Sequence, residues 1–111
     1  MSSVEPRADV FDALADPTRR ALLRAVVDQA PVTATQLAAD LPISRQAVAK
    51  HLDLLDQVGL VHRTRVGRET QFDARLDALD DASVWIDETS KAWRGRLDRL
   101  AALERTRRAR R

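Results

Sequence analysis

The 111-residue sequence has no cysteine and no tyrosine, and its three glycines lie far apart, at positions 59, 67 and 95. The lack of cysteine excludes disulfides, thiolate metal ligands, iron–sulfur clusters and cysteine nucleophiles. So few glycines leave no glycine-rich phosphate loop, and no serine–histidine–acid arrangement stands out. The two histidines, His51 and His62, are a poor start for a zinc site. We therefore expect neither an enzyme nor a cofactor.

Long hydrophobic runs are also missing. No apolar stretch approaches the roughly 18 residues that a membrane span requires. The first ten residues lack the basic and then apolar pattern of a signal peptide. These features predict a cytoplasmic protein without a membrane partner. Hydrophobic residues make up 44% and charged residues 32% of the chain, as is typical of one folded domain.

Neither sign of charge is in large excess, but the charge is unevenly distributed. The net charge is +2, yet residues 105–111 contain five arginines and no acid. Without those arginines, 14 basic and 17 acidic side chains remain, a net charge of −3. A nucleic-acid surface would therefore have to be a local patch. Basic side chains do gather between positions 44 and 68, where Asp53 and Asp56 are the opposing acids.

Two helices are predicted in the first thirty residues. Apolar residues recur at helical spacing in 8–15 and again in 16–30. Asp16 is suited to be an N-cap, and Pro17 follows it in the first helical position, where proline is favoured.

The next two predicted helices are joined by a tight connector. Threonine and glutamine at the spacing of a capping box start a helix over 33–41. Pro42 prevents its simple continuation. Ser44 is a second N-cap, for a helix over 44–58 that ends before Gly59. Two short helices joined in this way predict a helix-turn-helix.

The pattern then changes to that of strands. Residues 60–66 and 69–74 are rich in β-branched residues and flank Gly67–Arg68, which predicts a hairpin with a type II′ turn. From Leu76 to Leu103, a stripe of mostly large apolar residues, with serines at 83 and 90, recurs at alternating steps of three and four, which predicts one long packing helix. The expected fold class is mainly α with a small β-hairpin, a winged helix-turn-helix with a long C-terminal helix.

We expect three parts along the chain: a flexible N-terminus (1–7), one DNA-binding and dimerisation domain (8–104) and a disordered Arg-rich tail (105–111). The tail either adds nonspecific DNA affinity or is simply a solvated end, and nothing in the sequence decides between these roles.

The helix over 44–58 has two different sides. Its apolar side faces the core and consists of Val48, Leu52, Leu55 and Val58. Its other side holds the residues predicted to bind DNA: Ser44, Arg45, Gln46, Ala49 and Lys50. Arginine can pair with guanine and glutamine with adenine in the major groove, and a capped helix N-terminus suits a phosphate. The alternative is an ordinary solvated helix face, which the neighbouring connector and basic hairpin argue against.

Three segments together identify a family: "ALADPTRRALL" (13–23), "ISRQAVAKHLDLLDQVGLV" (43–61) and "RVGRETQFDA" (65–74). They resemble the ArsR-type family of winged helix-turn-helix repressors. The resemblance implies a homodimer that binds an inverted repeat in double-stranded DNA and is released by a signal, here an unidentified small-molecule inducer. It implies that the wing, 60–74, reaches the DNA backbone or minor groove through Arg63, Arg65 and Arg68. It assigns the dimer interface to Val10, Phe11, Leu14, Leu79, Ile86 and Trp93.

The metal-sensing members of this family differ from this sequence. Their thiolate site would fall in 35–41, which has no cysteine, and their C-terminal site would fall in 77–90, which has carboxylates but no histidine. Carboxylates alone make a weak site for a hard cation. We expect a metal-independent member. Trp85 and Trp93 either pack in the core or dimer, or line a small-molecule pocket.

A second function class stays open, namely a winged-helix protein-interaction module that does not bind DNA. The clustered arginines of the hairpin favour DNA, since a purely protein interface has less need of them.

Overall fold

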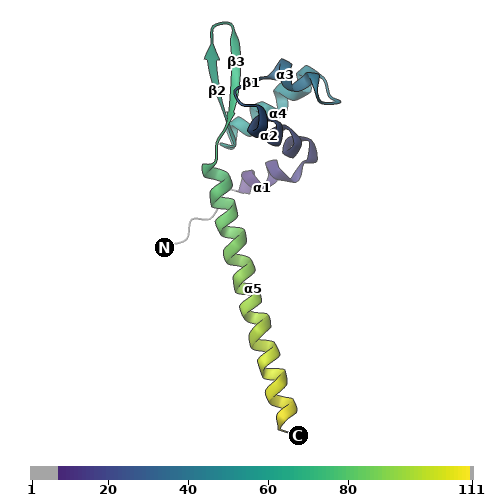
Figure 1. Ribbon diagram of the computed structural model, residues 1–111, viewed down its shortest axis with the longest axis vertical. Coiled ribbons are helices and arrows are strands. Elements are labelled where there is room, and N and C mark those ends of the chain that lie inside the picture. The colour runs from purple at the N-terminus through teal and green to yellow at the C-terminus, as the bar shows by residue number, and fades with distance from the viewer. Residues whose placement is uncertain (1–7, 111) are drawn as a thin grey trace.

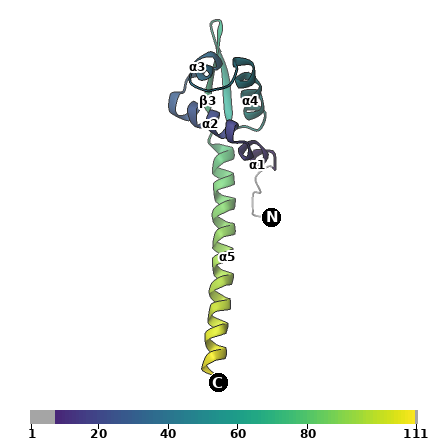
Figure 2. The same ribbon diagram turned by 90° about the vertical axis from the view of Figure 1, so that its right-hand side faces the viewer.

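The chain forms a head of short helices around a small sheet, and one long helix leaves the head (Figures 1 and 2). This computed structural model describes residues 8–110; the predicted flexible N-terminus, 1–7, and residue 111 lie outside the described residues. The elements in chain order are α1 (Ala8–Ala15), α2 (Pro17–Gln29), β1 (Val32–Thr33), α3 (Ala34–Ala39), α4 (Arg45–Gln57), β2 (Val61–Val66), β3 (Glu69–Ala74) and α5 (Asp77–Ala109).

The predicted helix starts are confirmed. Asp16 caps α2 by accepting a hydrogen bond from the backbone N–H of Thr18 at 3.3 Å. Thr33 and Gln36 form the capping box of α3, with reciprocal hydrogen bonds of 2.9 and 3.1 Å. Ser44 caps α4 by accepting from the N–H of Ala47 at 3.1 Å. Side-chain oxygens thus satisfy backbone donors that a helix start leaves without partners.

The end of α4 turns the chain sharply into the wing. Gly59 has φ +81°, a conformation that glycine adopts at little cost. The N–H of Leu60 donates to the carbonyl of Leu55 at 2.9 Å, and that of Gly59 donates to Asp56 at 3.1 Å. This pair of bonds is a Schellman motif. It fixes where β2 begins relative to α4.

The α1–α2 junction has a second set of caps, which the sequence pattern did not indicate. Arg19 Nε donates to the carbonyl of Ala13 at 2.9 Å, and Arg20 donates to that of Leu14 at 2.8 Å. The two guanidinium groups therefore satisfy carbonyls at the C-terminal end of α1 and complement its dipole.

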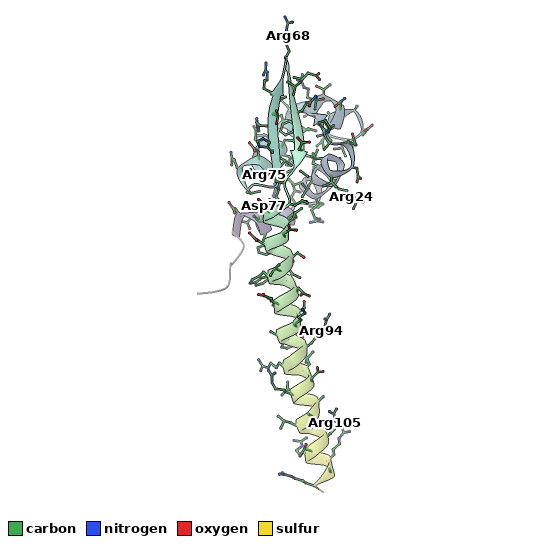
Figure 3. All side chains as sticks on the ribbon, turned by 60° about the vertical axis from the view of Figure 1, so that its left-hand side comes forward. Arg24, Arg68, Arg75, Asp77, Arg94 and Arg105 are labelled. Atoms are coloured by element: carbon green, nitrogen blue, oxygen red, sulfur yellow. The ribbon has the colours of Figure 1, made fainter. Side chains whose placement is uncertain are left out.

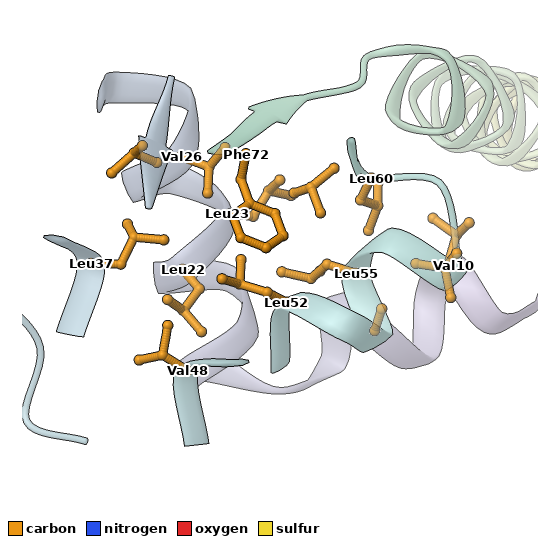
Figure 4. Packing of buried hydrophobic residues seen from close by; sticks show 14 of the residues in the cluster. Val10, Leu22, Leu23, Val26, Leu37, Val48, Leu52, Leu55, Leu60 and Phe72 are labelled. Carbon is orange, nitrogen blue, oxygen red and sulfur yellow. The ribbon is translucent and has the colours of Figure 1, made fainter. Parts of the chain in front are cut away.

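The core of the head lies between α2, α3, α4 and the sheet (Figure 4). All four apolar residues predicted on α4 are buried, together with Leu22, Leu23 and Val26 of α2. Phe72 of β3 is only 4% exposed and closes the core from the sheet side. A fully buried apolar face explains why α4 presents its polar side outward.

The sheet has three strands in the order β1-β3-β2, all antiparallel. The hairpin of β2 and β3 is as predicted. Gly67 has φ +61°, and no residue other than glycine has a positive φ within 8–110, which fits the predicted type II′ turn. The third strand, β1, pairs Val32 with Phe72 and was not expected from the sequence. A two-residue strand is too short for a pattern of alternation.

Helix α5 is longer than predicted. It continues through Ala109, so residues 105–109, expected in a disordered tail, are helical. Arg107 and Arg108 pair with Glu104 at 3.0 and 3.5 Å, one turn back on the same helix. These i, i+3 and i, i+4 pairs and the basic last turn both favour helix. Ala82 is the one buried residue of α5.

Candidate nucleic-acid interface

The outer side of α4 presents the predicted reading residues. Arg45, Gln46, Ala49 and Lys50 are exposed on the side opposite the buried leucines. Ser44, Arg45, Gln46 and Ala49 line one open hollow of about 490 Å³. Ala49 has the smallest side chain in this set, so a partner can approach the helix backbone between the longer side chains. The surface thus combines hydrogen-bonding groups with close access.

A deeper groove separates α4 from the wing. It has a volume of about 570 Å³ and is lined by Arg45 and Ala49 of α4 and by Arg65 and Arg68 of the wing. Residues of the α3 N-terminal turn, Thr35 and Gln36 among them, form a third wall, and the acids Asp53 and Glu69 also line the groove. Arg45 and Arg68 are 23 positions apart in the chain, and folding brings them to one concavity. The sequence did not point to the α3 wall, because its capping box is explained by helix initiation alone.

The wing ends in a basic tip. Arg68 lies at the very end of the hairpin (Figure 3), and it is exposed. Arg65 Nε donates to the carbonyl of Gly67 at 3.1 Å, which holds its guanidinium toward the tip. Within residues 8–110 neither arginine forms an ion pair with an acid, so both positive charges are available to an anionic partner.

Arg63 is differently placed from the other two wing arginines. Its Nε donates to Asp56 Oδ2 at 3.1 Å, and a terminal nitrogen donates to Asp53. The hydrogen bond with Asp53 raises the pKa of Arg63, ahead of an opposing effect of burial. The prediction of Arg63 as a DNA contact is not supported by this arrangement, because two carboxylates already occupy the guanidinium.

The predicted dimer residues divide into two groups. Val10 is 2% exposed and lies in the core of the head, so its side chain leaves little surface for the interface predicted there. Phe11 packs edge-on against Trp85 with ring centroids 5.6 Å apart, and Leu14 and Leu79 are half-buried. Ile86 and Trp93 are 51% and 57% exposed on α5. Five of the six predicted residues are therefore at least partly exposed, and one is buried.

Metal-ligating side chains do not gather in the described part of the chain. No group of three or more histidine, aspartate or glutamate residues within 8–110 is placed to hold an ion. His51 lies on α4, with its Nδ1 3.9 Å from Oδ2 of Asp16, the N-cap of α2. None of the helices in 8–110 combines the length and apolar character needed to cross a membrane.

The chain is similar to known regulators of transcription. A helix-turn-helix domain profile matches residues 14–64. Rv2034, an HTH-type transcriptional regulator of Mycobacterium tuberculosis, is 41% identical over 87 residues, which cover 78% of each protein. The transcriptional repressor SdpR of Bacillus subtilis is 30% identical over 78 residues, which cover 70% of this chain and 86% of SdpR.

Solved structures agree with these sequence matches. An ArsR-like transcriptional regulator from Rhodococcus sp. RHA1 superposes with a TM-score of 0.74 at 39% identity, covering 84% of this chain and 87% of that protein. The common architecture includes the helix-turn-helix, the wing and the C-terminal helix. The chain thus belongs to the ArsR-type family of winged helix-turn-helix transcriptional regulators, and not to a family of enzymes.

Proposed function

We propose that this protein is a homodimeric repressor that binds an inverted-repeat operator, with α4 in the major groove and the wing on the backbone or minor groove. The observation that carries the proposal is the groove between α4 and the wing, where Arg45, Arg65 and Arg68 converge. Unpaired guanidinium groups on two sides of one concavity suit a phosphate backbone that passes between them. As a repressor of chromosomal genes, the protein would act in the cytoplasm.

The first turn of α4 supplies the proposed base contacts. Arg45 and Gln46 are exposed there. Arginine can donate two hydrogen bonds to O6 and N7 of guanine, and glutamine can donate to N7 and accept from the N6 amino group of adenine. Ser44 already caps the helix, so its neighbouring backbone and Lys50 are suited to phosphates on either side. In this proposal Arg45 and Gln46 read the bases, whereas Lys50 and the N-terminal backbone of α4 position the protein on the phosphates.

Helix α5 supplies the proposed dimer interface. Ile86, Trp93, Leu97 and Leu100 are between 44% and 57% exposed and follow one another at steps of seven, four and three. A monomer has no reason to keep a continuous apolar stripe in water, whereas a second copy covers it. Phe11 and Leu14, half-buried beside the start of α5, would extend this surface.

The charges of α5 favour an antiparallel pair. Its first half carries five acids, Asp77, Asp80, Asp81, Asp87 and Glu88, and most of its bases follow from Lys91 onward. Only an antiparallel partner places the acidic half of one helix beside the basic half of the other.

The sizes of the stripe residues support the same register. Centred near Lys91, an antiparallel pair sets Ser90 opposite the partner's Trp93 and Leu97 opposite the partner's Ile86. Small and large side chains then alternate across the interface, as close packing requires. A parallel pair would instead stack Trp93 on itself. The two heads would lie at opposite ends of the pair, and the operator half-sites should be a whole number of helical turns apart, so that both heads meet the same face of the duplex.

The test is selection of duplexes from a random DNA pool by the purified protein at about 150 mM salt, where nonspecific phosphate binding is weak. The expected result is enrichment of an inverted repeat with half-sites a whole number of helical turns apart. No enrichment from a folded dimeric sample would contradict the proposal and favour the protein-interaction module. Repeating the selection with cell metabolite extract would detect an inducer as a loss of retained DNA.

A further inference from the structure

A cluster of four side chains joins the wing to α4, and DNA binding as proposed above does not require it. Arg63 stands on β2 directly opposite Phe72 of β3. Its guanidinium reaches across to α4, where it bonds to Asp56 at 3.1 Å and to Asp53. The guanidinium carbon lies 5.4 Å from the centroid of the Phe72 ring, a cation–π distance. We call these four residues the wing clamp.

The wing clamp is unsuited to binding a phosphate. It contains two carboxylates and one guanidinium, so its net charge is −1, and Asp53 lines the groove itself. A phosphate would have to displace a carboxylate from Arg63 and then remain beside it. Arg65 and Arg68 lie further along the same hairpin, and within 8–110 no carboxylate is paired with either of them.

The clamp is well placed to set the angle between wing and reading helix. In β2 only Val61 is buried, and the other five residues are exposed, so packing holds the strand at one end. Among side-chain hydrogen bonds and ion pairs within 8–110, those of Arg63 are the ones that join the wing to α4. The planar guanidinium contacts two carboxylates one helical turn apart, which fixes direction as well as distance.

We propose that Arg63 is a positioning residue that does not touch DNA: clamped by Asp53 and Asp56 over Phe72, it holds the wing at the angle at which Arg68 reaches the backbone. This inference rests on the proposed function for its purpose, but the clamp itself can be measured in the free protein. It predicts that Asp53, an acid in the lining of the groove, and Asp56, one turn further along α4, both strengthen DNA binding.

Whether Asp53→Asn lowers or raises operator affinity distinguishes a positioning role of Arg63 from a direct contact with DNA. If Arg63 bound a phosphate, Asp53→Asn would remove a repulsive charge and free the arginine, so operator affinity would rise. If Arg63 is a clamp, the same substitution loosens the wing and operator affinity falls. The matched control is Glu69→Gln, which removes one acid from the same groove and touches no clamp residue.

We expect Asp53→Asn to weaken operator binding about fivefold and Glu69→Gln to leave it equal or strengthen it about twofold. Arg63→Ala should weaken binding about as much as Asp53→Asn, and the double variant should be no worse than either alone. Arg63→Lys should not restore it, because an ammonium cannot bridge both carboxylates. The slope of log affinity against log salt should stay at the wild-type value in Arg63→Ala.

A rise in affinity for Asp53→Asn equal to that for Glu69→Gln, with a salt slope lowered by about one in Arg63→Ala, would overturn the inference and make Arg63 a phosphate contact. Amide hydrogen exchange of β2 and β3 without DNA provides the independent measurement. Exchange should quicken at least about threefold in Arg63→Ala while the helices of the head keep theirs. Unchanged strand exchange would refute the clamp even if the wild type bound no DNA, whereas quickened exchange without DNA binding would refute the proposed function alone.

Discussion

The head and α5 differ in how far their apolar residues are buried. In α4 the core-facing leucines and valine are fully buried, while the large residues of α5 beyond Ala82 lie in water. Both helices show the same three-and-four spacing in the sequence. The spacing therefore identifies an apolar face but not what covers it. In the head the cover is the same chain, and for α5 we propose that it is a second copy.

The buried face of α4 should show the largest effect. Leu52→Ala removes a fully buried side chain and leaves a cavity between α2, α4 and the sheet. We expect the free energy of unfolding of the head to fall by about 3 kcal/mol. Leu103→Ala, at a 66% exposed position of α5, is the control and should change it by less than about 0.5 kcal/mol. Equal losses from the two substitutions, measured by urea unfolding, would mean that α5 is as well covered as the head.

The same molecule shows which structural features could be predicted from the sequence alone and which could not. The caps at Asp16, Thr33 and Ser44 and the glycine at 59 were predictable, because each depends on groups within a few residues of the chain. The partners of Arg63 were not, because they depend on which face of the hairpin turns toward α4. Strand β1 was missed for the same reason, because its pairing with β3 is long-range. The helical residues 105–109 were missed for a different reason: they are helical as the continuation of a helix already formed, which their Arg-rich composition alone does not indicate.

Substitutions on the exposed side of α4 should have the next largest effect, here on operator affinity. Arg45→Ala should weaken operator binding by about 2 kcal/mol and relax the preference at one base pair, because a bidentate contact is lost. Arg68→Ala is the comparison within the same groove. It should weaken binding about equally for all sequences and lower the salt slope by about one. Competition titrations against duplexes mutated one base pair at a time measure both effects, and an unchanged preference for Arg45→Ala would exclude it as a reading residue.

A smaller effect should test how α5 pairs. In the antiparallel register Asp87 flanks the partner's Arg94, and by symmetry this contact occurs twice. Asp87→Arg should weaken dimerisation about fivefold, and adding Arg94→Asp should restore it, since exposed ion pairs contribute only modestly. A parallel pair brings these two positions nowhere near each other. Sedimentation equilibrium of both variants decides the matter: a double variant no better than the single would contradict the antiparallel pairing.

The smallest expected change concerns metals, and here the two regions should respond alike. Neither the head nor α5 gathers three ligating side chains within 8–110, and the acids of the first half of α5 are assigned above to charge pairing in the dimer. Treatment with a chelator, or addition of Zn²⁺ or Cd²⁺ at about ten times the protein concentration, should change operator affinity less than about twofold. The control is salt of equal ionic strength, because divalent cations also screen phosphates. A larger loss with Zn²⁺ than with that control, abolished in Asp87→Asn, would instead make the acidic half of α5 a metal sensor, and the proposed pairing of α5 would have to be revised with it.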